Sequence, residues 1–292
     1  MNATYDLHRH LWPVELLEEL RRRREPPRLD GWTLRLADGD YDLEPHAYGL
    51  ERCLAELDRD GISVAVVSLP PTLGIDELPA EEAEPLRAAY HEGALAAVAA
   101  SGGRLRALAL DRPRDGFAGV CVAASALADL DALAPVLDEL QRRGELLFVH
   151  PGLSPAAEGA PPWWQAVVGY TAQMQAAYAA WLAAGVDRWP DLRVLFAILA
   201  GGGPFQLERF RSRGFDVRRA QQPTIFFDVA SYGNRAIEHC LATLGGDALV
   251  YGSDAPVLDP RITLAAVRSF GEAVVNVLCH SNPEELLSAR HA

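Results

Sequence analysis

The sequence contains no lysine, and all 27 of its basic residues are arginine. The absence of side-chain amines excludes Schiff-base chemistry, lysine general bases and pyridoxal phosphate attachment. It also excludes a carbamylated lysine that bridges two metal ions, so any metal centre in this chain is expected to hold one ion.

Cysteine is scarce, and long apolar runs are absent. Cys53, Cys121, Cys240 and Cys279 lie far apart without a C-x-x-C pair, so neither a disulfide framework nor a thiolate zinc site is indicated. We expect buried thiols in a reducing compartment. No apolar run approaches the ~20 residues that span a bilayer, and no signal segment precedes the first strand. These features predict a cytoplasmic protein without a membrane partner.

Positive charge is outnumbered: the net charge is -13 and the pI is about 5.1. A nucleic acid or an anionic membrane would need a basic face, so neither is an expected partner. The single basic run, Arg21 to Arg24, adjoins Glu18, Glu19 and Glu25, as is typical of a solvated helix end.

The 292 residues, 49% of them hydrophobic, alternate between helical periodicity and short apolar runs. This rhythm predicts a parallel sheet covered by helices. Eight strands are expected: 3–10, 61–68, 105–110, 119–122, 146–149, 192–199, 225–228 and 249–251. Eight strands indicate a closed (β/α)₈ TIM barrel, which at this length is a single domain over residues 1–292. No G-x-G-x-x-G follows the first strand, and Gly201-Gly202-Gly203 lacks that spacing.

Residues 11–48 interrupt the alternation after the first strand. A helix is predicted over Leu11 to Glu25, where Pro26-Pro27 stop it. Asp38-Gly39 between two short alternating runs predicts a hairpin. We expect this helix and hairpin to form an inserted lid over the site.

His8 and His10 follow the first expected strand at a spacing of two. Side chains alternate along a strand, so Asp6, His8 and His10 are expected on one face. Two imidazoles on one face make half a metal site, although an isolated pair is more often a surface feature. The pair therefore needs ligands from elsewhere in the chain.

The C-terminal ends of barrel strands supply those ligands, because active sites of this fold lie there. His150 follows the fifth strand and Asp254 the eighth. A single histidine beside a proline turn, such as His150, more often has a structural role with its hydrogen bonds made inside the protein. A single aspartate in a segment like that of Asp254 is more often a turn residue. Together with His8 and His10 they make an N₃O donor set for one divalent metal ion such as Zn²⁺. Structural or exposed roles are expected for the remaining histidines except His46, a candidate for substrate contact: His91, His239, His280 and His291.

Four segments resemble a known family: 6–10 (Asp-Leu-His-Arg-His), 149–151 (Val-His-Pro), 201–204 (Gly-Gly-Gly-Pro) and 251–256 (Tyr-Gly-Ser-Asp-Ala-Pro). They are similar to the amidohydrolase-related family that includes aminocarboxymuconate-semialdehyde decarboxylase and γ-resorcylate decarboxylase. The resemblance implies a (β/α)₈ barrel with one zinc or manganese ion at His8, His10, His150 and Asp254. It also implies hydrolysis or decarboxylation of a small, often aromatic or ring-cleavage carboxylic acid.

The chain departs from that family at Ile198. The family has a histidine there that helps activate the metal-bound water, and isoleucine cannot accept a proton. General acid-base help is worth typically ~10²- to 10⁴-fold, so the change predicts either a weakened mechanism or a different one. Asp254 is then the remaining candidate general base. The alternatives left open are a catalytically impaired member that binds a ligand or stabilises a partner, and hydrolysis in which the substrate supplies the proton acceptor.

Substrate contacts are predicted from outside the metal set. Arg209 lies eleven residues after Ile198, a separation that resembles that of a carboxylate-binding arginine in the decarboxylases, which can reach across a dimer. A homodimer and a small-molecule substrate are therefore expected. Trp163 begins the helix after the fifth strand and could wall a pocket for a ring, although a packing role is the commoner one for such a residue.

Overall fold

Eight parallel strands form the centre of the protein, as predicted. The structure is a computed structural model that describes residues 3–155 and 159–288. The barrel strands are β1 (Tyr5–His10), β5 (Val64–Ser68), β6 (Leu105–Ala107), β7 (Gly119–Ala123), β8 (Leu146–His150), β9 (Val194–Phe196), β10 (Ile225–Asp228) and β11 (Leu249–Val250). They are short, apolar and almost wholly buried, because helices cover their outer side and side chains fill the interior.

The strands form two hydrogen-bonded sheets, β1-β5-β6 and β11-β10-β9-β8-β7. Two isolated parallel bridges join the sheets, Arg9 with Ala255 and Ala109 with Val120. The Leu7 N–H also donates to the Tyr251 carbonyl at 3.0 Å. These contacts close the ring between β11 and β1, so the ends of the first and last strands lie side by side.

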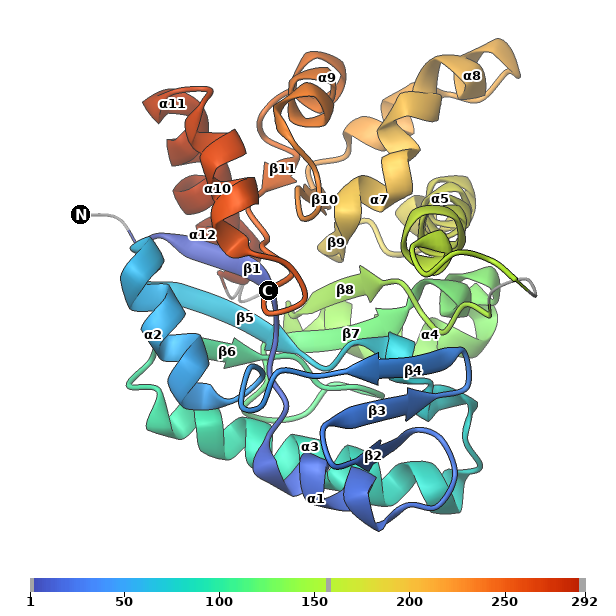
Figure 1. The fold of residues 1–292 in the computed structure, drawn as a ribbon. Helices are drawn as coiled ribbons and strands as arrows, with labels where there is room; N and C mark the ends of the chain where they lie inside the picture. Colours follow the sequence, from blue (N-terminus) through green and yellow to red (C-terminus); the bar gives the residue numbers. More distant parts are fainter. Residues whose placement is uncertain (1–2, 156–158, 289–292) are drawn as a thin grey trace.

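Helices surround the strands (Figure 1). Their bounds are α1 (Val14–Arg22), α2 (Leu50–Asp60), α3 (Ala80–Ala100), α4 (Leu130–Arg143), α5 (Tyr170–Ala180), α6 (Val186–Arg188), α7 (Ile198–Gly202), α8 (Leu207–Ser212), α9 (Asn234–Leu244), α10 (Pro260–Arg268), α11 (Glu272–Asn276) and α12 (Asn282–Leu287). Wider π-helical turns, 165–169 and 181–185, flank α5, so the long helix predicted over 163–184 is interrupted in its hydrogen-bond pattern. Among the described residues, no helix is long and apolar enough to cross a membrane.

The insertion after β1 forms a helix and a small antiparallel sheet. Helix α1 begins later and ends earlier than predicted, and the sheet has three strands where a hairpin was expected: β2 (Arg28–Asp30), β3 (Thr33–Leu36) and β4 (Gly39–Asp42). Figure 1 shows this sheet beside α1, at the edge of the barrel. The additional strand arises because the chain after Pro27 pairs with the outer side of the hairpin.

Candidate metal centre and cavity

The end of β1 carries His8 and His10 into the barrel mouth. Their rings are 5.1 Å apart between centroids, and the residues are 1% and 3% exposed. The predicted face is wrong for Asp6, because the register of β1 shifts between Asp6 and Arg9. The Asp6 carboxylate instead accepts from the Ser253 N–H at 3.0 Å and pairs with Arg9 at 3.3 Å.

His150 and Asp254 meet this histidine pair. One donor atom from each of the four residues lies within 4.8 Å of the others. His10 Nε2 is 3.0 Å and His8 Nε2 is 3.5 Å from Asp254 Oδ1. His150 closes the group, with its ring centroid 5.0 Å from that of His8. The four residues that the sequence predicted as ligands therefore lie around one point.

In each of the three imidazoles, Nδ1 contacts an oxygen acceptor, which leaves Nε2 available to bind a metal ion. His8 Nδ1 lies 2.9 Å from Asp228 Oδ2, His10 Nδ1 3.3 Å from the Ser68 carbonyl, and His150 Nδ1 2.9 Å from the Pro151 carbonyl. These acceptors favour the tautomer in which Nε2 carries the lone pair. His8 Nε2 is buried and has no hydrogen-bond partner among the described residues. A buried, unpaired imidazole nitrogen in an N₃O set fits a divalent metal ion.

Asp228 is a site residue that the sequence analysis missed. It ends β10, is fully buried, and accepts hydrogen bonds from the backbone N–H groups of Ile198 and Ala230 at 2.9 and 3.0 Å. The signal was a carboxylate at the end of an apolar strand, the same criterion that identified His150. Asp228 thus connects the ends of β9 and β10 to His8 on β1.

A glycine allows the last strand to approach the histidines. A side chain on Gly252 would place its Cβ 2.7 Å from His8 Cβ and 2.9 Å from Asp228 Cβ, closer than atoms pack. Asp254 follows in the left-handed region at φ 59°, which aspartate tolerates better than most residues. The Gly-Ser-Asp segment therefore positions its carboxylate through backbone geometry.

The charges of the cluster shift its pKa values. Burial opposes protonation of His8, but the Asp228 carboxylate outweighs it and raises the pKa of His8 to about 9. Burial, together with the charges that His8 and His10 carry when protonated, holds the pKa of His150 well below its usual value. Burial would raise the pKa of Asp254, but the close contact with His10 Nε2 and the positive charges that His8 and His10 carry when protonated lower it. Asp254 is accordingly a carboxylate that faces imidazole nitrogens.

Ile198 lies in the cavity wall, in an unusual backbone conformation. Ile198, Leu199 and Ala200 have φ values of 46°, 51° and 49°, so the chain makes a left-handed turn before Gly201. Each such residue costs ~1–2 kcal/mol, and β-branched isoleucine is especially disfavoured there. The hydrogen bond from the Ile198 N–H to Asp228 and the burial of the turn offset this cost.

The metal-ligand cluster forms one end of a cavity of about 430 Å³. The insertion contributes Leu34, Leu36, Tyr41 and Leu43 to its wall. Further aromatic rings come from Trp12, Tyr48, Tyr170 and Tyr232. The volume is within the range of small-molecule sites, ~300–1,000 Å³. The donor set and the cavity together could hold and orient a small organic substrate.

Three predicted substrate contacts lie outside the cavity wall. His46 is exposed and packs its ring against Trp32 at 5.3 Å, and Trp163 is 55% exposed beside Trp164. Arg209 lies on α8, in a separate groove. Of the other histidines, His91 is buried and His239 is exposed. His280 Nδ1 forms a hydrogen bond with the Ala3 carbonyl. His291 lies outside the described residues.

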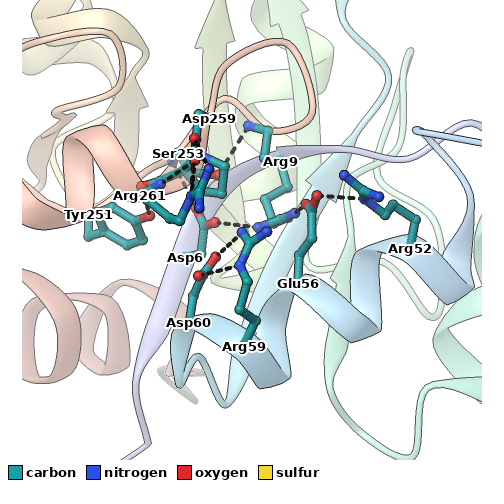
Figure 2. A network of polar contacts seen from close by, with 12 residues as sticks. Asp6, Arg9, Arg52, Glu56, Arg59, Asp60, Tyr251, Ser253, Asp259 and Arg261 are labelled. Atoms are coloured by element: carbon teal, nitrogen blue, oxygen red, sulfur yellow. Dashed lines mark hydrogen bonds and ion pairs between the residues drawn. The ribbon is translucent and has the colours of Figure 1, made fainter. Parts of the chain in front are cut away.

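A buried charge network lies behind β1, on the side of α2. Arg9, 2% exposed, extends from the strand and pairs with Glu56 at 2.5 Å as well as with Asp6. Figure 2 shows Arg9 between these carboxylates, with Arg52 on the other side of Glu56. The Asp6 carboxylate also accepts a hydrogen bond from the Ser253 N–H, so the network links α2 to the segment that carries Asp254.

The fold and this donor set define a (β/α)₈ protein with a candidate site for a divalent metal ion. The family model described as "Amidohydrolase" matches residues 5–288, and the chain belongs to that family. A curated relative, 2-amino-3-carboxymuconate-6-semialdehyde decarboxylase of Dictyostelium discoideum, is 25% identical over 177 residues. That match covers 54% of this chain and 49% of the relative, so it spans about half of the relative's length.

Solved structures share the fold over almost the whole chain. The apo form of IDCase from Metarhizium anisopliae has a TM-score of 0.80 at 20% identity and covers 98% of this chain and 97% of its own. The 5-carboxyvanillate decarboxylase of Novosphingobium aromaticivorans, complexed with manganese and 4-hydroxy-3-methoxy-5-nitrobenzoic acid, has a TM-score of 0.76 at 16% identity. It covers 98% of this chain and 96% of its own. These similarities confirm the predicted barrel.

Proposed function

We propose that the protein is a metal-dependent decarboxylase of a small aromatic or ring-cleavage carboxylic acid. The observation that carries the proposal is the convergence of His8, His10, His150 and Asp254 within 4.8 Å at the end of a cavity. Decarboxylase activity in the names of the curated relative and of the Novosphingobium structure supports this reaction class.

Zinc is the proposed ion, with manganese as the alternative. Three imidazoles and one carboxylate suit zinc, whereas manganese prefers sites richer in oxygen. Manganese in the Novosphingobium structure supports the alternative. A bound divalent ion would polarise a substrate oxygen and offset negative charge on it.

Side chains of the cavity supply the proton and the dry environment that this reaction needs. Decarboxylation breaks a carbon-carbon bond, releases CO₂ and requires one proton at the carbon that loses it. Asp254 is the candidate to deliver a proton taken from solvent, because its carboxylate lies at the cavity end beside His10. The apolar side chains of the wall reduce the access of water to the donor cluster, and the insertion sheet contributes to that wall as the proposed lid.

Ile198 bears on both candidate reactions. Hydrolysis needs a base to activate water, and an isoleucine cannot contribute to that step. The decarboxylation proposed here takes its proton through Asp254 and does not use the side chain at position 198. The same residue motivates the alternative of an impaired member that only binds a ligand.

Metal analysis and CO₂ release test the proposal. Purified protein should contain about one zinc or manganese per chain, and His8→Ala combined with His150→Ala should abolish it. His239→Ala, an exposed histidine outside the cluster, is the matched control. A metal-free wild type, or a metal-loaded wild type that releases no CO₂ from a panel of hydroxylated aromatic acids, would contradict the proposal. Metal binding without turnover would favour the binding alternative.

The predicted homodimer belongs to the same proposal. Sedimentation would establish the oligomeric state, and Arg209→Ala would test whether Arg209 of a second copy contributes to substrate binding. Loss of affinity for a carboxylate substrate in that variant, with metal content unchanged, would support the contact.

A further inference from the structure

The cavity wall has an uneven charge distribution. Among its described lining residues there is no arginine, and the sequence has no lysine. The ionisable groups other than tyrosine are His10, His150 and Asp254, all in the donor cluster. Within one chain, positive charge can therefore be offered to a bound ligand only at the donor cluster, where the negative charge of Asp254 is also present.

The rest of the wall is apolar or carries neutral hydroxyl groups. Leu34, Leu36 and Leu43 come from the insertion, and Val257 and Leu258 from the segment after Asp254. Hydroxyl groups come from Tyr41, Tyr48, Tyr170, Tyr232, Thr72, Thr171 and Ser231. Phenols have an ordinary pKa near ~10 and are neutral donors at pH 7. Such a wall can pair with hydroxyl or ether oxygens of a ligand but cannot neutralise an anion.

A carboxylate buried without a cation is strongly unfavourable, because it loses its hydration and gains no partner of opposite charge. One substrate carboxylate can lie at the donor cluster, against a metal ion. The enclosed part of the wall, which includes Trp12, Leu34 and Leu73, is only 3–4% exposed, and a second carboxylate placed there would meet apolar side chains without a cation.

We propose that the cavity selects monocarboxylates with an uncharged, hydroxyl-bearing body and excludes dicarboxylates. This specificity rests on the proposed function for the end that holds the reacting carboxylate. It assigns discrimination to the insertion sheet and α5, which contribute uncharged side chains to the wall.

Calorimetry on zinc-loaded protein tests the selection with a matched pair of probes. These are 2-hydroxybenzoate and 2-hydroxybenzene-1,3-dicarboxylate, which differ by one carboxylate. The dicarboxylate should bind about 100-fold more weakly or not at all. Equal or tighter binding of the dicarboxylate, or no binding of either acid, would overturn the proposal.

A new cation in the wall should reverse the preference. Leu36→Arg on β3 and Thr171→Arg on α5 each place a guanidinium on the lining, and at least one should raise dicarboxylate affinity tenfold or more. Val14→Arg, at a residue 61% exposed and outside the lining, is the control and should change nothing. Thermal unfolding confirms which variants fold. If every folded wall variant still rejects the dicarboxylate, charge is not the determinant and the proposal fails.

Two outcomes separate this proposal from the proposed function. Monocarboxylate binding without CO₂ release contradicts the function and leaves the selectivity standing. Release of CO₂ from the dicarboxylate at the rate of the monocarboxylate contradicts the selectivity alone. Dicarboxylate binding that Arg209→Ala abolishes would also overturn the selectivity, by showing that a second copy brings a cation to the cavity.

Discussion

His8 Nδ1 lies 2.9 Å from Asp228 Oδ2, and both residues are almost wholly buried. The contact joins β1 to β10, which β11 separates, and constrains the orientation of the His8 ring. Because Asp228 also accepts from the Ile198 N–H, one carboxylate orients a candidate ligand and holds the left-handed turn.

Asp228→Asn should weaken metal binding about 10- to 100-fold, as loss of such an outer partner typically does. The amide oxygen can still accept from Ile198, but the amide nitrogen repels the N–H of His8 Nδ1 and favours the wrong tautomer. Competition with a chelator gives the affinity. Asp115→Asn, whose carboxylate is exposed, is the control and should match wild type. An unchanged affinity in Asp228→Asn would refute the positioning role.

Ile198→His should leave CO₂ release within about tenfold of wild type if decarboxylation does not need an activated water. Ile198→Asn tolerates the same left-handed backbone without an imidazole and controls for relieved strain. Steady-state kinetics on the same substrate compares the three proteins. A gain of ~10²-fold or more in the histidine variant alone would instead favour the impaired-member alternative.

Arg9→Ala should cost about 3–5 kcal/mol of unfolding free energy, because it leaves Asp6 buried without its cation and removes the buried one of the two arginines that pair with Glu56. Arg52 pairs with the same Glu56 from an exposed position, so Arg52→Ala should cost less than about 1 kcal/mol. Urea unfolding measures both. Similar losses in the two variants would show that the buried network is not a stabilising unit.

Stability should fall as the pH is lowered from about 6.5 towards 4, partly through His91. Burial, and the positive charge of Arg114, lower the pKa of His91 to about 4, and its Nε2 accepts from the Leu110 N–H at 3.1 Å. The unfolded chain therefore binds the proton first, which favours unfolding over this interval. Asp111 opposes the shift, and Arg87 and Arg112 reinforce it.

His91→Gln should flatten this part of the pH profile by about 1–2 kcal/mol, because the amide does not titrate. Urea midpoints measured at several pH values test it. The exposed His239→Gln is the control and should keep the wild-type slope. A wild-type slope in His91→Gln would assign the acid sensitivity to other groups.

Local patterns in the sequence determined the barrel and its four candidate ligands. The alternation of apolar strands with helices can be recognised from the periodicity of short segments of the sequence. The four candidate ligands each lie at the end of such a strand or shortly after it: His8, His10, His150 and Asp254. The strand ends of a parallel barrel meet at one face, so residues far apart in sequence could be assigned to one site. Composition alone likewise excluded chemistry that needs a lysine amine.

Tertiary structure decided the contacts that no local pattern encodes. The register of β1 against β5 shifts between Asp6 and Arg9, and the Asp6 carboxylate contacts Arg9 and Ser253. The role of Asp228 depends on its distance to His8, 220 residues earlier in the chain. The composition of the cavity wall depends on where the insertion sheet packs, and packing between distant segments is set by the folded shape rather than by periodicity.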